Sequence, residues 1–147
     1  VNGRKVCGIL TELSMEVDCI NYVVIGVGIN VNQEHFPEEI REVAGSLYME
    51  LGKKTPRAEL AAAVLKELEK LYGIFLQTED LSLLCHSYNE LCVNRGREIR
   101  VLDPGKEYIG TTDGINASGE LVVRRADGSE TCVYAGEVSV RGLYGYV

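Results

Sequence analysis

The sequence predicts an α+β protein whose first part mixes strands with helices and whose last part is a small β-barrel. Three observations support this fold class: strand and helix periodicities share the first part, short alternating runs separated by turn dipeptides fill the last, and glycine becomes frequent near Val93. With 46% hydrophobic and 25% charged residues, the 147-residue chain has the composition of a folded soluble protein. We therefore predict two domains, over residues 1–93 and 94–147.

The chain opens on a hairpin signal. Asn2-Gly3 favours a type I′ turn between two strands, of which only Val1 precedes the turn. The second hairpin strand is predicted over 4–13, and a longer strand rich in valine and isoleucine over 20–31. Because the chain begins inside a hairpin and without Met, we expect it to be the C-terminal portion of a longer protein.

Three helices are predicted next, each with apolar residues at helical spacing. The first covers 37–51, with Gly52 as its stop signal. The second begins with Thr55 as N-cap and Pro56 as its first helical residue, and the third lies near 81–91. Their apolar stripes predict that all three pack against a core.

Five short strands are predicted after Val93, with turns at Asp103-Pro104-Gly105, Ser118-Gly119 and Asp127-Gly128. Their predicted ranges are 98–102, 107–112, 120–125, 130–134 and 137–141. So few short strands favour a small SH3-like or OB-like barrel, since closure avoids open edges.

The strand over 20–31 has two different faces. Its odd positions from Val23 to Val31 are branched and apolar, so we expect them in the core. Its even positions include Gly26, Gly28 and Asn30, which would leave a trough closed by an amide. The alternative is that the glycines relieve a bulge or close packing. A dinucleotide-binding fingerprint is rejected, because a third glycine is missing and the pair lies within a strand.

Lys5 heads an otherwise apolar row that continues with Cys7 and Ile9. Its ammonium must reach solvent, a partner or an anionic ligand, because an unpaired buried charge is costly. Snorkelling at a strand end is the simpler alternative. The functional hypothesis is that the Lys5 amine and the Asn30 amide face one cleft whose floor is glycine.

Charge and cysteine content exclude several functions. Fifteen basic and 22 acidic residues give a net charge of −7, which argues against nucleic acid as a partner of this chain. The five cysteines are an odd number without metal-ligand spacing, so we expect free thiols, no metal site and a cytoplasmic protein. No apolar run is long enough for a membrane span and no charged-then-apolar segment opens the sequence, so we expect neither a membrane span nor a secretory signal. His35 and His86 are interpreted as surface or packing residues.

Three motifs then resemble a known family. They are VNGRKVCGILTE over 1–12, VIGVGINVN over 24–32 and GEVSVR over 136–141. Together, and in this order, they resemble biotin protein ligase, a family that includes biotin operon repressors. The similarity extends over nearly the whole chain and includes a helix at 44–47.

The resemblance implies an ATP-dependent ligase, with Mg as the counter-ion of ATP, that joins biotin to AMP. It then transfers biotin to a lysine of the biotin carboxyl carrier domain of acetyl-CoA carboxylase. The implied fold is the C-terminal part of a class II aminoacyl-tRNA synthetase-like catalytic domain followed by an SH3-like barrel. Some members also carry an N-terminal helix-turn-helix and dimerise, so homodimerisation is kept as a hypothesis for this chain.

The resemblance also implies roles for single residues. Lys5 matches the lysine beside the biotin carboxylate and the adenylate phosphate, and is the candidate catalytic residue. Gly8 and Gly26 match positions where backbone approaches biotin. The implied nucleotide-binding residues are Asn30, Glu137 and Arg141. Cys7 occupies a small-residue position and is expected to pack.

The sequence departs from the family by omission. The glycine- and arginine-rich loop over biotin and the tryptophan-containing stretch before the hairpin are absent from these 147 residues. We therefore expect this chain alone to be inactive. Two other readings stay open: a non-catalytic binding or dimerisation module, and a relative of lipoate ligase.

Overall fold

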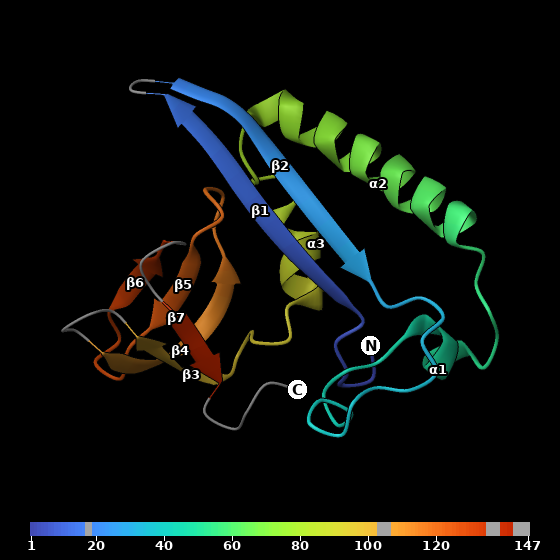
Figure 1. Cartoon of the computed structure of the whole chain (residues 1–147). Coiled ribbons are helices and arrows are strands. Elements are labelled where there is room, and N and C mark those ends of the chain that lie inside the picture. The colour runs from blue at the N-terminus through green and yellow to red at the C-terminus, as the bar shows by residue number, and fades with distance from the viewer. Residues whose placement is uncertain (17–18, 103–106, 135–138, 143–147) are drawn as a thin grey trace. The chain divides into compact units, whose positions relative to one another are not determined.

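The structure, a computed structural model, describes residues 1–16, 19–102, 107–134 and 139–142, the last four by their backbone only. It divides into two compact units, of which one comprises Val1–Ala62 and the other begins at Ala63. The first unit contains a two-stranded sheet and a short helix, and the second a five-stranded sheet and a helix packed on it (Figure 1). A long helix, α2, contains the division between them.

The first unit is built on a long hairpin of β1, Cys7–Glu16, and β2, Cys19–Ile29 (Figure 1). Both were predicted, although each prediction began or ended a few residues away. Before β1, Asn2 and Gly3 both have positive φ, and Val1 and Arg4 exchange two backbone hydrogen bonds of 2.9 Å. This confirms the predicted two-residue turn, because a type I′ turn needs positive φ at both central residues.

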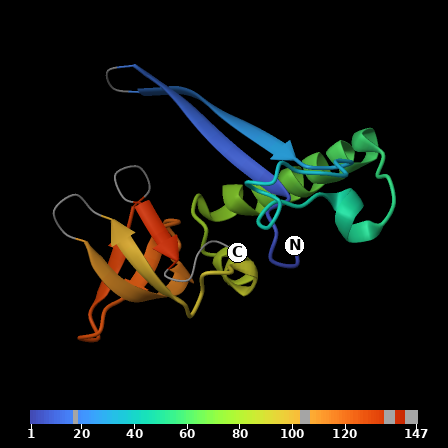
Figure 2. The ribbon, with the colours of Figure 1, turned by 60° about the horizontal axis from the view of Figure 1, so that its bottom comes forward.

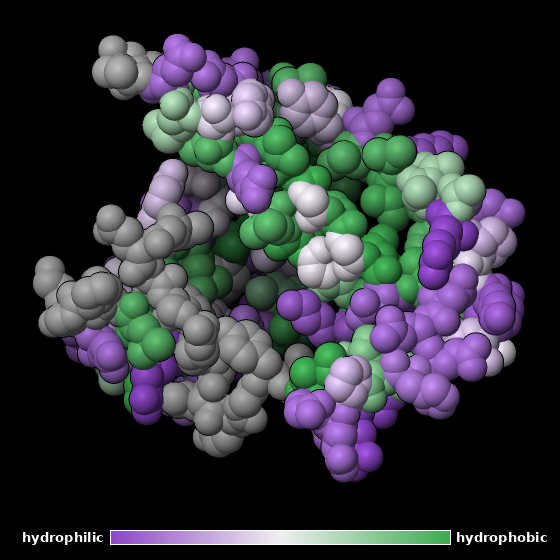
Figure 3. All heavy atoms as spheres, in the orientation of Figure 1, coloured by the Kyte–Doolittle hydropathy of each residue, from purple (hydrophilic) through white to green (hydrophobic). Residues whose placement is uncertain are grey.

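The predicted burial of one β2 face is wrong for this chain. Val23, Ile25 and Val27 are 48–58% exposed, and apolar residues of β1 such as Ile9 are exposed as well. Figure 3 shows hydrophobic side chains, in green, on the surface over the hairpin. A sheet of only two strands has no second layer of its own, so its apolar pattern does not bury it.

The helix predicted over 37–51 is also wrong for most of its length. Only α1, Leu47–Leu51, is helical, with Ser46 as its N-cap and Gly52 in the left-handed conformation as its predicted C-terminal stop. The residues just before α1 are extended instead of helical at Ala44, which forms a parallel bridge with Lys5. Pairing with a segment distant in sequence has overridden the local helical pattern.

The two later helices are confirmed, with altered bounds. α2 runs over Arg57–Thr78, and the carbonyl of Pro56 accepts the N–H of Leu60. α3 is shorter than predicted, Cys85–Leu91. Neither contains a buried residue, so the prediction that their apolar stripes lie in a core is wrong for this chain. No helix in the described ranges has the length and apolarity needed to cross a membrane.

The second unit contains an antiparallel sheet in the order β6-β5-β4-β3-β7, seen from another side in Figure 2. Its strands are β3, Glu98–Leu102; β4, Tyr108–Ile115; β5, Leu121–Arg124; β6, Glu130–Val133; and β7, Ser139–Gly142. Ile99, Val101 and Val123 form its core and are at most 1% exposed. Five strands were predicted. Within the described residues, however, β6 and β7 remain the edges of an open sheet, and the predicted closure into a barrel is not observed.

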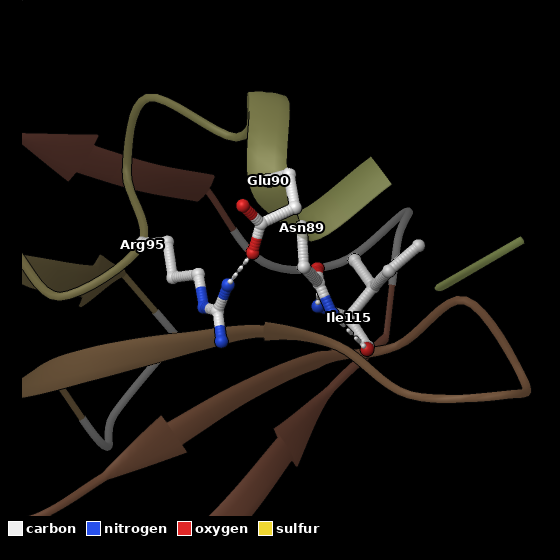
Figure 4. A network of polar contacts seen from close by, with 4 residues as sticks. All are labelled: Asn89, Glu90, Arg95 and Ile115. Carbon is white, nitrogen blue, oxygen red and sulfur yellow. Dashed lines mark hydrogen bonds and ion pairs between the residues drawn. The ribbon is translucent and has the colours of Figure 1, made fainter. Parts of the chain in front are cut away.

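The side-chain amide of Asn89 joins helix α3 to strand β4. Asn89 donates to the carbonyl of Ile115 at 3.0 Å and accepts the N–H of Ile115 at 2.8 Å (Figure 4). A register shift lies just before, between Thr112 and Gly114, and Gly114 has a φ of 104°. A side chain on Gly114 would collide with Asn89, so this glycine lets the helix approach the strand.

Candidate functional site

The hairpin carries a strip of bare backbone on one face. Gly8 of β1 is paired with Gly28 of β2, and Leu10 with Gly26, so the three glycines share a face. A Cβ on Gly26 would meet only the Leu10 carbonyl oxygen, at 3.6 Å, and one on Gly28 only the Gly8 carbonyl oxygen, at 3.8 Å. We call Gly8, Gly26 and Gly28 the glycine floor. Gly8 of β1 therefore joins the glycines that were predicted from β2, and Leu10, opposite Gly26, keeps a side chain on the same face.

Lys5 lies at one end of the glycine floor. A Cβ placed on Gly8 would be 3.8 Å from Cε and 3.9 Å from Nζ of Lys5. The amine is therefore on the glycine face, whereas strict alternation had placed Lys5 in the row of Cys7. Alternation fails because β1 begins only at Cys7 and Lys5 sits in an isolated bridge before it. Its side chain is exposed, and no described acid lies within ion-pair distance of it.

Asn30 directly follows β2. Its backbone N–H donates to the Val6 carbonyl at 2.8 Å, and its side-chain Nδ2 donates to the Gly45 carbonyl at 3.0 Å. The side chain is half-buried. One of its two amide N–H groups is thus engaged, whereas its Oδ1 accepts no hydrogen bond from the residues the structure describes.

A segment that the sequence analysis assigned to a helix joins Lys5 to Asn30. Lys5 donates its N–H to the Val43 carbonyl at 2.7 Å, and its own carbonyl accepts the N–H of Gly45 at 3.0 Å. Ala44 lies between these two bonds and is 8% exposed. We call residues Val43–Ser46 the latch segment. Its small residues, Ala44–Ser46, were the one sequence feature that could have indicated close packing. That they pack against the segment around Lys5 is known only from the structure.

A second feature of the first unit is a shallow hollow of about 660 Å³ where α2 begins. It is lined by Asn32, Lys54, Thr55, Pro56 and Arg57. Asn32 holds the backbone of Thr55 by two reciprocal hydrogen bonds of 2.9 Å. The sequence analysis singled out Thr55 only as a helix cap and did not predict this hollow.

The remaining predicted site residues are Glu137 and Arg141. The backbone of Arg141 is paired with Arg100 of β3. Glu137 lies outside the described residues. His35 and His86 are both exposed, as expected of surface residues, and all five cysteines are free thiols.

Two carboxyl groups away from the hairpin have shifted pKa values. Hydrogen bonds from the side chain and backbone of Ser82 hold the pKa of Asp80 below its ordinary value. Ser129 does the same to the pKa of Asp127 in the turn between β5 and β6. Both carboxylates are exposed and stabilise turns.

Known proteins resemble this chain in sequence. Residues 96–141 match the family model of the biotin protein ligase C terminal domain. A bifunctional ligase/repressor BirA of Bacillus subtilis is 32% identical over 144 residues, and one of Escherichia coli is 30% identical over 141 residues. These alignments cover 95% and 96% of this chain and 43% of each relative. A biotin–acetyl-CoA-carboxylase ligase of Mycobacterium tuberculosis is 33% identical, over 92% of this chain and 48% of its own length. The chain thus spans less than half of these curated relatives.

Solved structures resemble it in fold. The apo structure of biotin protein ligase from Aquifex aeolicus superposes with a TM-score of 0.82 and 28% identity, covering 97% of this chain and 61% of that one. The same ligase in complex with biotin and ATP gives a TM-score of 0.77 and 27% identity, over 95% of this chain and 57% of the ligase.

Proposed function

Because this chain is related over nearly its whole length to the C-terminal portion of biotin protein ligases, we propose that it is part of an enzyme that ligates biotin. In this proposal the parent protein joins the biotin carboxylate to the α-phosphate of ATP with release of pyrophosphate. It then transfers biotin to a lysine of a biotin carboxyl carrier domain of acetyl-CoA carboxylase with release of AMP. Mg accompanies ATP as its counter-ion rather than as a resident metal of this chain. One observation carries the proposal: a lysine amine lies beside Gly8, at one end of three glycines that share a face of the hairpin.

The chemistry of adenylation explains why that pair of features matters. A carboxylate that attacks an α-phosphate brings two anions together, so a fixed ammonium that binds the developing charge lowers the barrier. Lys5 is exposed and near the glycine floor, which suits this role. Gly8 and Gly26 would let biotin lie against the backbone, and Asn30 would offer its Oδ1 to the nucleotide.

Two residues of the predicted second domain also belong to the proposal. Arg141, and Glu137 with it, would contact the nucleotide from the second domain. We also propose that residues 1–93 belong to a class II aminoacyl-tRNA synthetase-like catalytic domain, and residues 94–147 to an SH3-like domain. The free thiols suit the reducing cytoplasm, where carboxylases are modified.

The proposal includes the inactivity of these 147 residues on their own. The hairpin that carries the glycine floor is exposed on both faces, since Leu10 and Ile9 on opposite faces are 65% and 69% exposed. A site open to water on this scale screens its charges and does not orient substrates. Binding of the adenylate is therefore a better measurement of this chain than turnover.

Calorimetry with biotinyl-5′-AMP tests the proposed function. We expect saturable binding by the chain and a loss of affinity of about tenfold in Lys5→Ala, since a charge-assisted contact contributes roughly 1.5 kcal/mol. Lys66→Ala, an exposed lysine on α2, is the matched control and should bind like the unmodified chain. Equal affinity in Lys5→Ala and Lys66→Ala would remove the central residue from the proposal.

Two alternatives have their own measurements. A lipoate ligase relative would bind lipoyl-AMP more tightly than biotinyl-AMP in the same calorimeter. A non-catalytic dimerisation module is favoured by the exposed apolar side chains of a two-stranded sheet, whose outer strand edges pair with no other named strand in the described residues. It would bind neither adenylate and would sediment as a discrete dimer.

A further inference from the structure

The last three residues of the latch segment are the only buried run in the described part of the first unit. Ala44, Gly45 and Ser46 are buried in succession, and Ser46 is 0% exposed, whereas the hairpin beside them is largely exposed. Ser46 donates to the Gln33 carbonyl at 2.5 Å and caps α1 through the N–H of Met49. A short buried segment in an otherwise exposed unit can fix the position of a neighbouring segment.

What it holds is the backbone of Lys5. Both polar backbone groups of Lys5 are used by the latch segment: the N–H by Val43 at 2.7 Å and the carbonyl by Gly45 at 3.0 Å. These bonds fix the direction in which the Lys5 side chain leaves the chain, since a residue bonded on both sides cannot rotate freely. The amine therefore reaches Gly8 from a defined origin.

Gly45 is the point at which this arrangement admits no larger residue. A Cβ on Gly45 would lie 2.9 Å from Cβ of Arg4 and 3.6 Å from Cγ1 of Val6. Cβ of Arg4 is bonded to the backbone, so it can move only if the chain next to Lys5 moves. Asn30 also holds Gly45, because its side-chain Nδ2 donates to the Gly45 carbonyl, and its backbone carbonyl accepts the N–H of Leu47.

We propose that Gly45 is a positioning residue for Lys5, and that Asn30 acts on Lys5 through Gly45 in addition to facing the ligand. This inference rests on the proposed function for its consequence, which is that the ammonium meets the adenylate at one position. It differs from a structural role, because it predicts that the effect of Gly45 on binding passes through the Lys5 side chain.

A double-mutant cycle with two readouts tests the inference in the full 147-residue chain. The variants are Gly45→Ala, Lys5→Ala and the double variant, with Gly73→Ala as matched control, since a Cβ on Gly73 meets nothing within 4 Å. Amide hydrogen exchange of Lys5 is measured without ligand, and affinity for biotinyl-5′-AMP by calorimetry. We expect Gly45→Ala to speed exchange at Lys5 by about tenfold and to weaken binding by about fivefold, with less than about twofold further loss in the Lys5→Ala background.

Several results would overturn the inference. Unchanged exchange at Lys5 in Gly45→Ala would do so, as would an equal binding loss with and without the Lys5 side chain. If Gly45→Ala unfolds the first unit, Asn30→Ala replaces it in the ligand-free exchange measurement, because the bond to the Gly45 carbonyl is the one described side-chain hydrogen bond of Asn30 and its loss must speed the same exchange. Absence of adenylate binding by the unmodified chain would count against the proposed function alone, since exchange at Lys5 still decides whether Gly45 holds it.

Discussion

At the scale of single residues, the distinctive feature of the hairpin is its three glycines, which carry no side chain. Three glycines in two long strands cost stability, because glycine loses more backbone entropy on folding than any other residue and packs nothing. In return Gly8 and Gly28, paired across the strands, leave backbone exposed beside the Lys5 amine. The arrangement is intelligible if a flat molecule occupies the strip.

Filling the glycine floor should therefore separate binding from folding. Gly28→Val places a branched side chain where only the Gly8 carbonyl oxygen is near, at 3.8 Å, and valine favours strands. We expect biotinyl-5′-AMP affinity to fall at least about tenfold while the urea midpoint stays equal or rises. Val27→Ile, which enlarges the opposite face, should leave affinity unchanged. Binding retained by Gly28→Val would show that the ligand does not use the floor.

At the scale of elements, local signals succeeded where pairing is local. The strand predicted over 98–102 is observed at Glu98–Leu102, since one of its partners, β4, is the next strand in the sequence, although β3 also pairs with the distant β7. The same kind of reasoning failed over 37–46, where the bridge between Lys5 and Ala44 decides the conformation. It also failed for the Lys5 side chain, whose face depends on where β1 begins. Periodicity carries no information on either.

The attachment of α3 to β4 should depend on one amide rather than on the neighbouring ion pair. Asn89 exchanges two hydrogen bonds with Ile115, half-buried, whereas the Glu90–Arg95 pair at 3.0 Å is 59% and 48% exposed (Figure 4). Asn89→Ala should lower the free energy of unfolding by about 2 kcal/mol, because it leaves two backbone groups unpaired. Glu90→Ala should cost less than about 0.5 kcal/mol in the same urea titration. Equal costs would contradict this assignment.

The turn between β5 and β6 gives a prediction in acid. Hydrogen bonds from Ser129 lower the pKa of Asp127, so the carboxylate form is favoured in the folded turn. Its contribution to stability is therefore present above the ordinary pKa of aspartate and is lost as pH falls through the lowered value. We expect an NMR titration to show a lowered pKa for Asp127 and its return toward the ordinary value in Ser129→Ala. Ser118→Ala, in the turn before β5, should leave it unchanged.

At the scale of the whole molecule, the two units differ in how they are held together. The second unit has a closed core of Ile99, Val101 and Val123, whereas the hairpin keeps its apolar side chains at the surface. The composition predicted a folded chain, but it could not predict that the second unit buries its apolar side chains and the hairpin does not. The apolar sequence pattern of a strand is the same whether or not its face is covered.

Hydrogen exchange of the whole chain should reproduce that inequality. Bonded amides of β3, β4 and β5 should exchange at least about tenfold more slowly than bonded amides of β1 and β2, because local opening of the hairpin exposes little additional apolar surface. Amides of α3 near Asn89 should follow the sheet. A hairpin as protected as the sheet would show that its exposed faces are covered in solution.

The glycine floor also sets a limit on how the site can be altered. Glycine is the smallest residue, so every substitution at Gly8, Gly26 or Gly28 narrows the available space and none can widen it. If the floor binds biotin as proposed, a bulkier carboxylic acid could be admitted only by moving the strands apart. A single substitution at one of the glycines could, in contrast, favour a slimmer acid.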